Sequence, residues 1–250
     1  NLNVDSDACG TLSAVFVRYS DNGGVVEHKW VGVVASGLRS KLYRPAITVH
    51  HAGNCVRVWS RQLADLVRIV GGASGSEWQT MGAAAASEVV TSVVHPASEN
   101  AWELRPATLM SAMSVVDGRT ATQTAGNVWS STAWVVSGAG RGVASVEGSM
   151  CRGRGVDHEY YWETEFVTVV SDDLCVGVLD GLSSAATAEA QTSKAGMTHV
   201  HHNAAFCSSP MLHFASNTVN MGNARSRPFE RPGGNLAGWR LGLCLNLNVD

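Results

Sequence analysis

Short segments in which β-branched, aromatic and other apolar residues alternate with polar residues recur along most of the chain. The clearest of these segments cover residues 11–19, 46–50, 55–60, 120–125, 160–170 and 174–180. Such alternation is typical of β-strands that bury one face. The turn-forming sequences DNGG, HAGN and VDGR interrupt the strands. The pattern predicts an all-β fold, a sandwich of two antiparallel sheets.

The stretch from Arg61 to Asn100 departs from this pattern. Residues 61–70 form a candidate short helix, a Gly/Ser-rich segment follows, and the Ala-rich run after it also has helix propensity. We therefore predict that residues 61–100 are a connector, part linker and part helical segment.

The pentapeptide NLNVD occurs at residues 1–5 and again at residues 246–250. The second copy ends the segment LGLCLNLNVD (241–250), whose crowded apolar positions predict a buried or half-buried strand. No initiator Met precedes the first copy, which runs directly into the strand predicted at 11–19. We therefore expect the sequence to begin inside a folded unit, and a further strand to follow the second copy.

Charge and hydropathy narrow the classes of partner. The 250 residues include 18 basic and 21 acidic side chains, a formal net charge of −3, with no block of like charge. This balance favours neither a nucleic acid nor an anionic membrane surface as a partner. The apolar runs are also much shorter than a membrane-spanning helix requires.

The six cysteines are widely spaced, and none belongs to a CxxC pair. They are Cys9, Cys55, Cys151, Cys175, Cys207 and Cys244. Several lie in strand-like sequences such as NCVRVW, where a free thiol acts as a small buried apolar group. Reduced thiols and a cytoplasmic, intracellular location are our interpretation, and disulfides or a zinc site remain the alternatives.

Residues 152–181 read RGRGVDHEYYWETEFVTVVSDDLCVGVLDG and resemble the central stretch of a SPRY domain, with its "YWE" and "VGV" strands. Upstream, residues 101–134 resemble the entry strands of that family. Downstream, GWRLGLCLNLNVD (238–250) resembles its "GD-IGV-LDLD" strand, although Trp239 and Arg240 stand where an acidic residue is usual. The resemblance implies a SPRY-like, concanavalin-like sandwich.

The elements that should follow in a SPRY domain are found at the front of the chain. They are CGTLSAVFVRY (9–19), DNGG (21–24) and SGLRSKLYRPAITVHHAGNCVRVW (36–59). The resemblance therefore implies a circularly permuted order. Residues 1–60 would form the C-terminal half of the sandwich, 61–100 the connector and 101–250 the N-terminal half.

Two situations produce such an order. One is a circular permutant in which the connector joins the old termini, and the other is one period of a tandem array. In both, only one NLNVD copy fits the strand position within a sandwich. The spare copy either frays or pairs with another chain, so a homo-oligomer through exchange of the terminal strand is an open alternative.

Candidate partner-binding residues come from two regions. The turn after the strand at 46–50 presents His50, His51 and Asn54, and the next strand carries Arg57 and Trp59. In similar SPRY domains this loop helps to shape a peptide-binding surface, and aromatic and Arg side chains are common interface anchors. The 117–134 region adds three further candidates, namely Arg119, Trp129 and Trp134. The alternatives to partner binding are structural roles, as turn histidines without a partner and as tryptophans that fill the core.

His199 and His201 in THVHH would lie on one face of an extended strand, about 7 Å apart. This spacing suits two metal ligands, but no carboxylate follows closely and no HExxH occurs, so we predict no metal and keep both as candidate contact residues. A GxSxG motif is also absent, and SGAGRGVAS lacks the βαβ context of a nucleotide site. Glu163 and Glu165 share one strand face, which a half-exposed strand explains.

We therefore predict a protein-interaction module, not an enzyme, with no cofactor. It would bind a partner protein or short peptide through loops at one edge of the sandwich. The resemblance implies a substrate-recognition domain of a larger protein such as a ubiquitin ligase adaptor. The alternatives are a self-assembling tandem-repeat or strand-swapped structural protein and a carbohydrate- or metal-binding sandwich.

Overall fold

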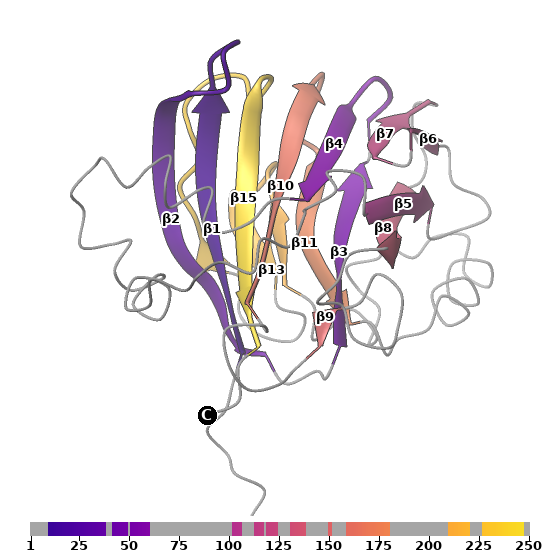
Figure 1. Cartoon of the computed structure of the whole chain (residues 1–250). Coiled ribbons are helices and arrows are strands. Elements are labelled where there is room, and N and C mark those ends of the chain that lie inside the picture. The colour runs from indigo at the N-terminus through magenta and orange to yellow at the C-terminus, as the bar shows by residue number, and fades with distance from the viewer. Residues whose placement is uncertain are drawn as a thin grey trace, which may run out of the picture.

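The chain is seen in a computed structural model that describes 11 segments. They are residues 10–38, 42–49, 51–60, 102–106, 113–117, 119–124, 131–138, 150–151, 159–180, 210–220 and 227–247. All regular elements in these segments are β-strands, and they form two antiparallel sheets packed face to face (Figure 1). The predicted all-β class and the two sheets are confirmed. The predicted connector at 61–100 lies outside the described residues.

Both sheets mix strands from the two ends of the sequence. The seven-stranded sheet has the order β2 (Val25–Leu38), β1 (Gly10–Tyr19), β15 (Trp239–Asn246), β10 (Glu159–Thr168), β4 (Cys55–Ser60), β7 (Thr120–Gln123) and β6 (Met113–Val116). The eight-stranded sheet has the order β14 (Arg227–Pro228), β13 (Thr218–Asn220), β12 (Met211–His213), β11 (Leu174–Asp180), β3 (Leu42–Val49), β8 (Ser131–Gly138) and β5 (Trp102–Pro106), with β9 (Met150–Cys151) paired to β3.

Strands from opposite ends of the chain are direct neighbours in the seven-stranded sheet. β1 pairs with β15 in an antiparallel register that places Thr11 opposite Asn246 and Arg18 opposite Trp239. The end of β15 therefore lies beside the beginning of β1, at the lower end of the sheet in Figure 1.

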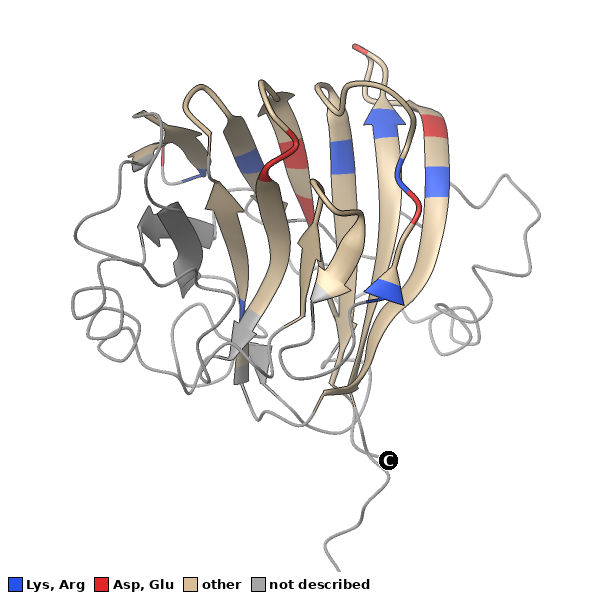
Figure 2. Cartoon of the chain, turned by 180° about the vertical axis from the view of Figure 1, so that it is seen from behind, with Lys and Arg blue, Asp and Glu red and all other residues tan. Residues whose placement is uncertain are grey.

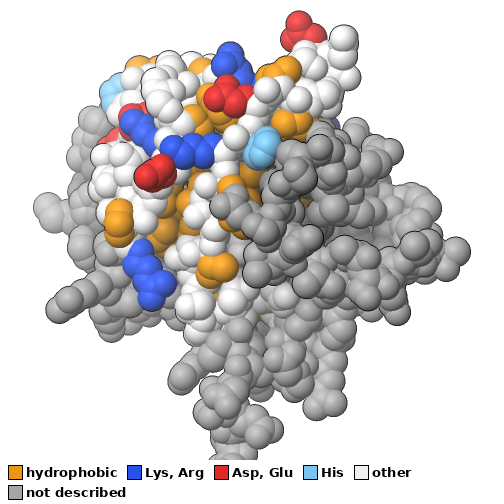
Figure 3. Space-filling model, turned by 90° about the vertical axis from the view of Figure 1, so that its left-hand side faces the viewer, with side chains coloured by type: hydrophobic (Ala, Val, Ile, Leu, Met, Phe, Trp, Pro, Cys, Tyr) orange, Lys and Arg blue, Asp and Glu red, His pale blue; other side chains and the backbone are white. Residues whose placement is uncertain are grey.

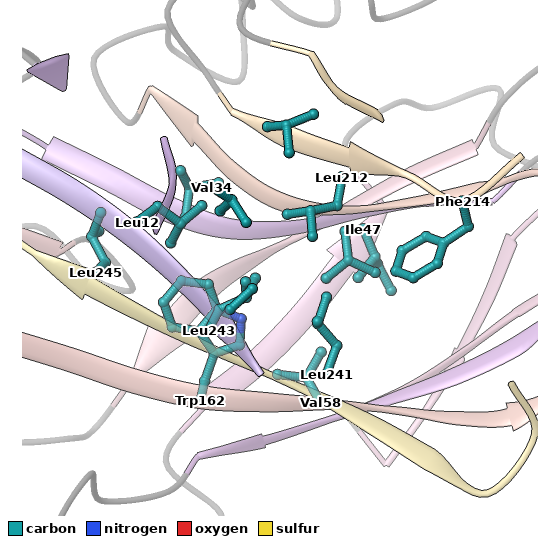
Figure 4. Packing of buried hydrophobic residues seen from close by; sticks show 14 of the residues in the cluster. Leu12, Val34, Ile47, Val58, Trp162, Leu212, Phe214, Leu241, Leu243 and Leu245 are labelled. Carbon is teal, nitrogen blue, oxygen red and sulfur yellow. The ribbon is translucent and has the colours of Figure 1, made fainter. Parts of the chain in front are cut away.

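The core lies between the two sheets and follows from strand alternation. In β10, Trp162 and Phe166 point inward and are at most 1% exposed. Phe214, which follows β12 in the other sheet, makes edge-to-face contacts with Phe166 and with Phe16, at ring-centroid distances of 5.1 and 6.2 Å. Aliphatic side chains such as Leu243 and Leu212 fill the space around these rings (Figure 4). Burial of this shared cluster holds the two sheets together.

The long edge strand β2 was not predicted, and its irregular pairing explains why. Its register with β1 shifts at several positions, so its side chains do not alternate strictly between faces. Gly32 and Gly37 have φ angles of 89° and 74°, a left-handed conformation that favours glycine. A strand interrupted in this way lacks the period-two pattern on which sequence prediction depends.

The edge formed by β2 mixes charged, polar and single apolar side chains (Figure 3). Val26 and Val33 are 62% and 58% exposed, whereas Lys29 forms an ion pair with Glu230 at 3.1 Å and donates to the carbonyl of Arg231. Bulges and charged residues of this kind discourage the addition of a further strand.

Candidate partner-binding surface

Aromatic and charged side chains gather on the outer face of the seven-stranded sheet, away from the core. The outward positions of β10 and β4 hold Glu163, Glu165, Arg57 and Trp59, because the residues between them point into the core. Figure 2 shows that the charged residues of β1, β15, β10 and β4 lie toward the end of the sheet where β1 finishes and β15 begins.

The strand register brings opposite charges into one row across the sheet. Glu165 on β10 is opposite Arg240 of β15 on one side and Arg57 of β4 on the other. In the next row Glu163 is opposite Gly242 and Trp59. Cross-strand and diagonal neighbours at these positions are close enough for polar side chains to interact.

Arg240 lies between two aromatic rings. Its guanidinium carbon is 4.5 Å from the ring centroid of Tyr19 and 4.8 Å from that of Trp59. Its Nη1 donates to Glu163 Oε2 at 3.2 Å, so the ion pair and both ring contacts hold the guanidinium in one position. An Arg guanidinium, unlike a Lys ammonium, can contact aromatic faces and hold a planar carboxylate at the same time.

Glu163 is a buried carboxylate whose oxygens receive several donors. It is 1% exposed, and its Oε1 accepts hydrogen bonds from Tyr19 at 2.5 Å and from Tyr161 at 3.0 Å. These donors, together with Arg240, offset the loss of hydration that burial imposes on a charged group. Burial raises the pKa of the Tyr161 hydroxyl well above its usual value of about 10.0, and the charges of Glu163 and Tyr19 add to the effect.

Trp59 is oriented by a second carboxylate and flanked by guanidinium groups. Its Nε1 donates to Glu165 Oε2 at 2.7 Å, which fixes the indole on the sheet. Arg57 and Arg119 each have the guanidinium carbon 5.7 Å from the indole centroid. Arg57 also donates from Nε to the Thr120 hydroxyl at 2.9 Å.

A tight turn between β6 and β7 positions Arg119. Asp117 has a φ angle of 54°, and its Oδ1 accepts hydrogen bonds from the backbone N–H groups of Arg119 and Thr120, both at 3.1 Å. Partial burial works against ionisation, but these N–H groups, the Thr120 hydroxyl and the charge of Arg119 together lower the pKa of Asp117 below its usual value of 3.8. The turn predicted at VDGR is therefore present, and the side chain of Asp117 stabilises it by accepting hydrogen bonds from the backbone N–H groups that follow.

We call this group of side chains the Trp59 cluster. It consists of Tyr19, Arg57, Trp59, Arg119, Tyr161, Glu163, Glu165 and Arg240. Arg57, Trp59 and Arg119 were predicted as partner-binding residues, and the structure brings them together.

The other predicted contact residues are placed differently. Asn54 is fully buried, accepts from the N–H groups of Val170 and Ser171 and donates to the Ser171 carbonyl, so its amide holds that loop and is not on the surface. His51 is exposed, and its Nδ1 lies 2.9 Å from the carbonyl oxygen of Ala52. The backbone of Trp134 is in the other sheet, opposite Ala46 of β3. The remaining four candidates, His50, Trp129, His199 and His201, lie outside the described residues.

Sequence reasoning missed Tyr19 and Arg240 and treated the two glutamates as an ordinary strand face. Each is an outward residue of its strand, but the strands are distant in sequence, and only their register brings these residues into contact. The unusual Arg240 in the SPRY-like strand was the one available signal.

Two further findings concern only the part of the chain that the structure describes. Within it, no group of three or more His, Cys, Asp or Glu side chains is arranged to hold a metal ion. The same residues include no helix of the length and hydropathy needed to cross a bilayer.

No family model, curated protein or solved structure matches this chain. The resemblance to SPRY domains therefore stays a prediction that rests on the residues quoted for it.

Proposed function

We propose that the chain is a protein-interaction module that binds a partner protein or peptide through the Trp59 cluster. The observation that carries this proposal is the indole of Trp59, which is held by Glu165 and flanked by the guanidinium groups of Arg57 and Arg119. Trp, Tyr and Arg are the residues most often found at the energetic centres of protein interfaces.

The cluster is ordered before any partner arrives. Trp59 and Arg240 each have a hydrogen bond to a carboxylate, and Arg57 has one to Thr120. Side chains that are already fixed lose little conformational entropy on binding, so their contacts contribute more to affinity. Arg57 is 34% exposed, which leaves part of its guanidinium open to a partner.

The charge of the cluster indicates the chemistry of the partner. Arg57 pairs with Glu165 and Arg240 with Glu163, and the carboxylate of Asp117 balances the charge of Arg119, so three guanidinium groups lie beside the indole without an excess of charge. A peptide with an Asp or Glu next to an aromatic or aliphatic side chain complements this arrangement, because its carboxylate pairs with a guanidinium while its apolar group covers the ring.

We also propose that the sandwich is SPRY-like and circularly permuted. The neighbouring positions of β15 and β1 support this proposal, because a SPRY domain should continue from the strand resembled by 238–250 into the strand resembled by 9–19. A role as the substrate-recognition domain of a larger protein, such as a ubiquitin ligase adaptor, follows from the same resemblance and is part of the proposal.

The proposal can be tested by selecting a random peptide display library against the purified chain. We expect enriched peptides to carry an acidic residue beside an apolar one, and we expect Arg119→Ala to weaken their binding at least about tenfold. Arg227→Ala, on an exposed residue of β14 in the other sheet, is the matched control and should leave affinity unchanged. Failure to enrich any peptide, or enriched peptides that bind Arg119→Ala and the parent chain equally well, would contradict the proposal.

A further inference from the structure

Arg57 is the guanidinium of the Trp59 cluster whose outer donors are available to a ligand. Its Nε donates to the Thr120 hydroxyl at 2.9 Å, and its Nη1 is 3.9 Å from Glu165 Oε2, which is too far for a hydrogen bond. Among the described residues, none accepts a hydrogen bond from Nη1 or Nη2. Because 34% of the side chain is exposed, an acceptor on a partner has access to it.

The other two guanidinium groups of the cluster are already engaged. Arg240 donates to Glu163 at 3.2 Å and is 16% exposed, and its guanidinium lies between two aromatic rings. The charge of Arg119 is balanced by the carboxylate of Asp117 in the same turn. A carboxylate that binds at Arg240 would therefore have to replace a hydrogen bond that already exists, whereas one that binds at Arg57 would add new ones.

A short chain of hydrogen bonds fixes the direction of the Arg57 guanidinium. Thr120 is opposite Arg57 in the pairing of β4 with β7, and its hydroxyl donates to Asp117 Oδ2 at 3.4 Å. A hydroxyl that donates its one proton to Asp117 keeps its lone pairs for Nε of Arg57. With Nε held in this way, the planar fork of Nη1 and Nη2 is oriented to receive the two oxygens of one carboxylate.

The charges around Arg57 determine which anion fits. Glu165 is 3.9 Å from Nη1, and Glu163 lies on the same face of β10. These carboxylates repel every anion, and the repulsion grows with the charge of the ligand. A phosphorylated side chain carries a charge of about −1.5 to −2 near pH 7, whereas Asp or Glu carries a single charge. The surroundings of Arg57 therefore favour a carboxylate over a phosphate.

We propose that Arg57 determines the specificity of the Trp59 cluster by binding the carboxylate of an Asp or Glu in the partner through Nη1 and Nη2, in preference to a phosphorylated residue. Thr120 and Asp117 are positioning residues, because they act through Arg57. This inference rests on the proposed function, since it names the group at the same site that receives the acidic side chain of the partner.

Three tripeptides with blocked termini test the inference on the full chain. They are Leu-Glu-Leu, its Gln version and its phosphoserine version, each titrated to about 10 mM while the indole N–H of Trp59 is followed by NMR. We expect the Glu tripeptide to bind at least about tenfold more tightly than the Gln version and more tightly than the phosphoserine version. Arg57→Gln should abolish the preference for Glu over Gln. Arg227→Gln, on an exposed residue of β14, is the matched control and should keep it.

The positioning role of Thr120 is tested with the same peptides. Thr120→Val removes the hydroxyl that holds Nε of Arg57, so it should reduce the preference for Glu over Gln. Thr120→Ser retains the hydroxyl and should retain the preference. A purely structural role for Thr120 would weaken the binding of all three tripeptides by the same factor and would leave the preference unchanged.

Several results would overturn the inference. They are equal binding of the Glu and Gln tripeptides, tighter binding of the phosphoserine version, an unchanged preference in Arg57→Gln, and no binding of any tripeptide. The proposed function is judged separately, by the display selection and Arg119→Ala. If enriched peptides lose affinity for Arg119→Ala while Arg57→Gln leaves the preference for Glu unchanged, only the inference about Arg57 fails.

Discussion

Arg240 and Glu163 form an ion pair across neighbouring strands, with Nη1 3.2 Å from Oε2, on the outer face of a sheet. The carboxylate is 1% exposed and the Arg240 side chain 16%, so water screens this pair much less than it screens an exposed one. The same guanidinium contacts the rings of Tyr19 and Trp59. The pair therefore links the stability of the sheet to the shape of the proposed binding surface.

Removal of Arg240 should destabilise the protein by leaving Glu163 buried without its cation. We expect Arg240→Met to lower the free energy of unfolding by about 2–4 kcal/mol, less than for a fully isolated charge because Tyr19 and Tyr161 still donate to the carboxylate. The measurement is urea denaturation of the variant and the parent chain.

A double-mutant cycle and an exposed pair provide the controls. Arg240→Met combined with Glu163→Gln should lose less than the sum of the single losses, since the uncompensated charge is gone. Lys29→Met, which breaks the exposed pair with Glu230, should cost less than about 1 kcal/mol. If Arg240→Met and Lys29→Met lower the free energy of unfolding equally, then the buried Arg240–Glu163 pair contributes no more to stability than an exposed pair.

Gly242 leaves room for the ring of Tyr161 to lie across β15. A Cβ atom added at Gly242 would come within 3.0 Å of the Tyr161 ring carbons Cζ and Cε2, and would also meet its hydroxyl. We expect Gly242→Ala to lower the free energy of unfolding by about 1–3 kcal/mol through overpacking. Gly233→Ala, where an added Cβ meets nothing within 4 Å, should change it by less than about 0.5 kcal/mol.

The origin of this loss can be checked by removing the ring. Once Tyr161 is already Ala, Gly242→Ala should cost little further, because the atoms that an added Cβ would meet have gone. Tyr161→Phe should relieve the clash only in part, since the ring carbons remain. If the losses in free energy of unfolding for Gly242→Ala and Tyr161→Ala are strictly additive, then Gly242→Ala destabilises the protein through the backbone and not through the Tyr161 ring.

Tyr161 should resist ionisation in alkaline solution. Because burial raises the pKa of its hydroxyl in the folded state, the neutral form is favoured by folding. The stability that this provides is complete below pH 10.0, the ordinary pKa, and is lost as the pH rises toward the folded-state pKa. In an absorbance titration at alkaline pH, Tyr161→Phe should therefore differ from the parent chain only when the parent unfolds. A difference at a pH where both remain folded would contradict the burial of this hydroxyl.

Asp117 should stabilise the folded protein at neutral pH and lose this effect in acid. Its pKa is lowered in the folded state, so the stability it provides is present above pH 3.8 and is lost as the pH falls through the lower, folded-state pKa. Asp117→Asn should destabilise the protein slightly at pH 7, since the residue is exposed. The same substitution should have a smaller effect at pH 2, where the Asp117 carboxyl is protonated to a greater extent, and Asn also tolerates the positive φ angle. An equal loss at both pH values would indicate a conformational cause instead.

Local alternation made much of the fold predictable. The strand at 160–170 was expected with one buried and one half-exposed face. In β10 Trp162, Thr164 and Phe166 do point inward, but the outer face is also buried at Tyr161 and Glu163, which are 5% and 1% exposed. The strand at 55–60 matches β4, with Arg57 and Trp59 outward. Edge strand β2 escaped prediction because bulges and left-handed glycines break its period.

The chain's own sequence determined which residues of the regular strands, such as β4 and β10, face the core, because side-chain direction alternates with every residue and needs no distant partner. It also shows that the pentapeptide NLNVD occurs twice, at 1–5 and at 246–250. Only the tertiary structure decided that Tyr19, Trp59, Glu163 and Arg240 meet, since their contacts depend on the pairing and register of four strands. Register between strands far apart in sequence is set by how whole faces pack, and a shift of one residue would turn this cluster into the core.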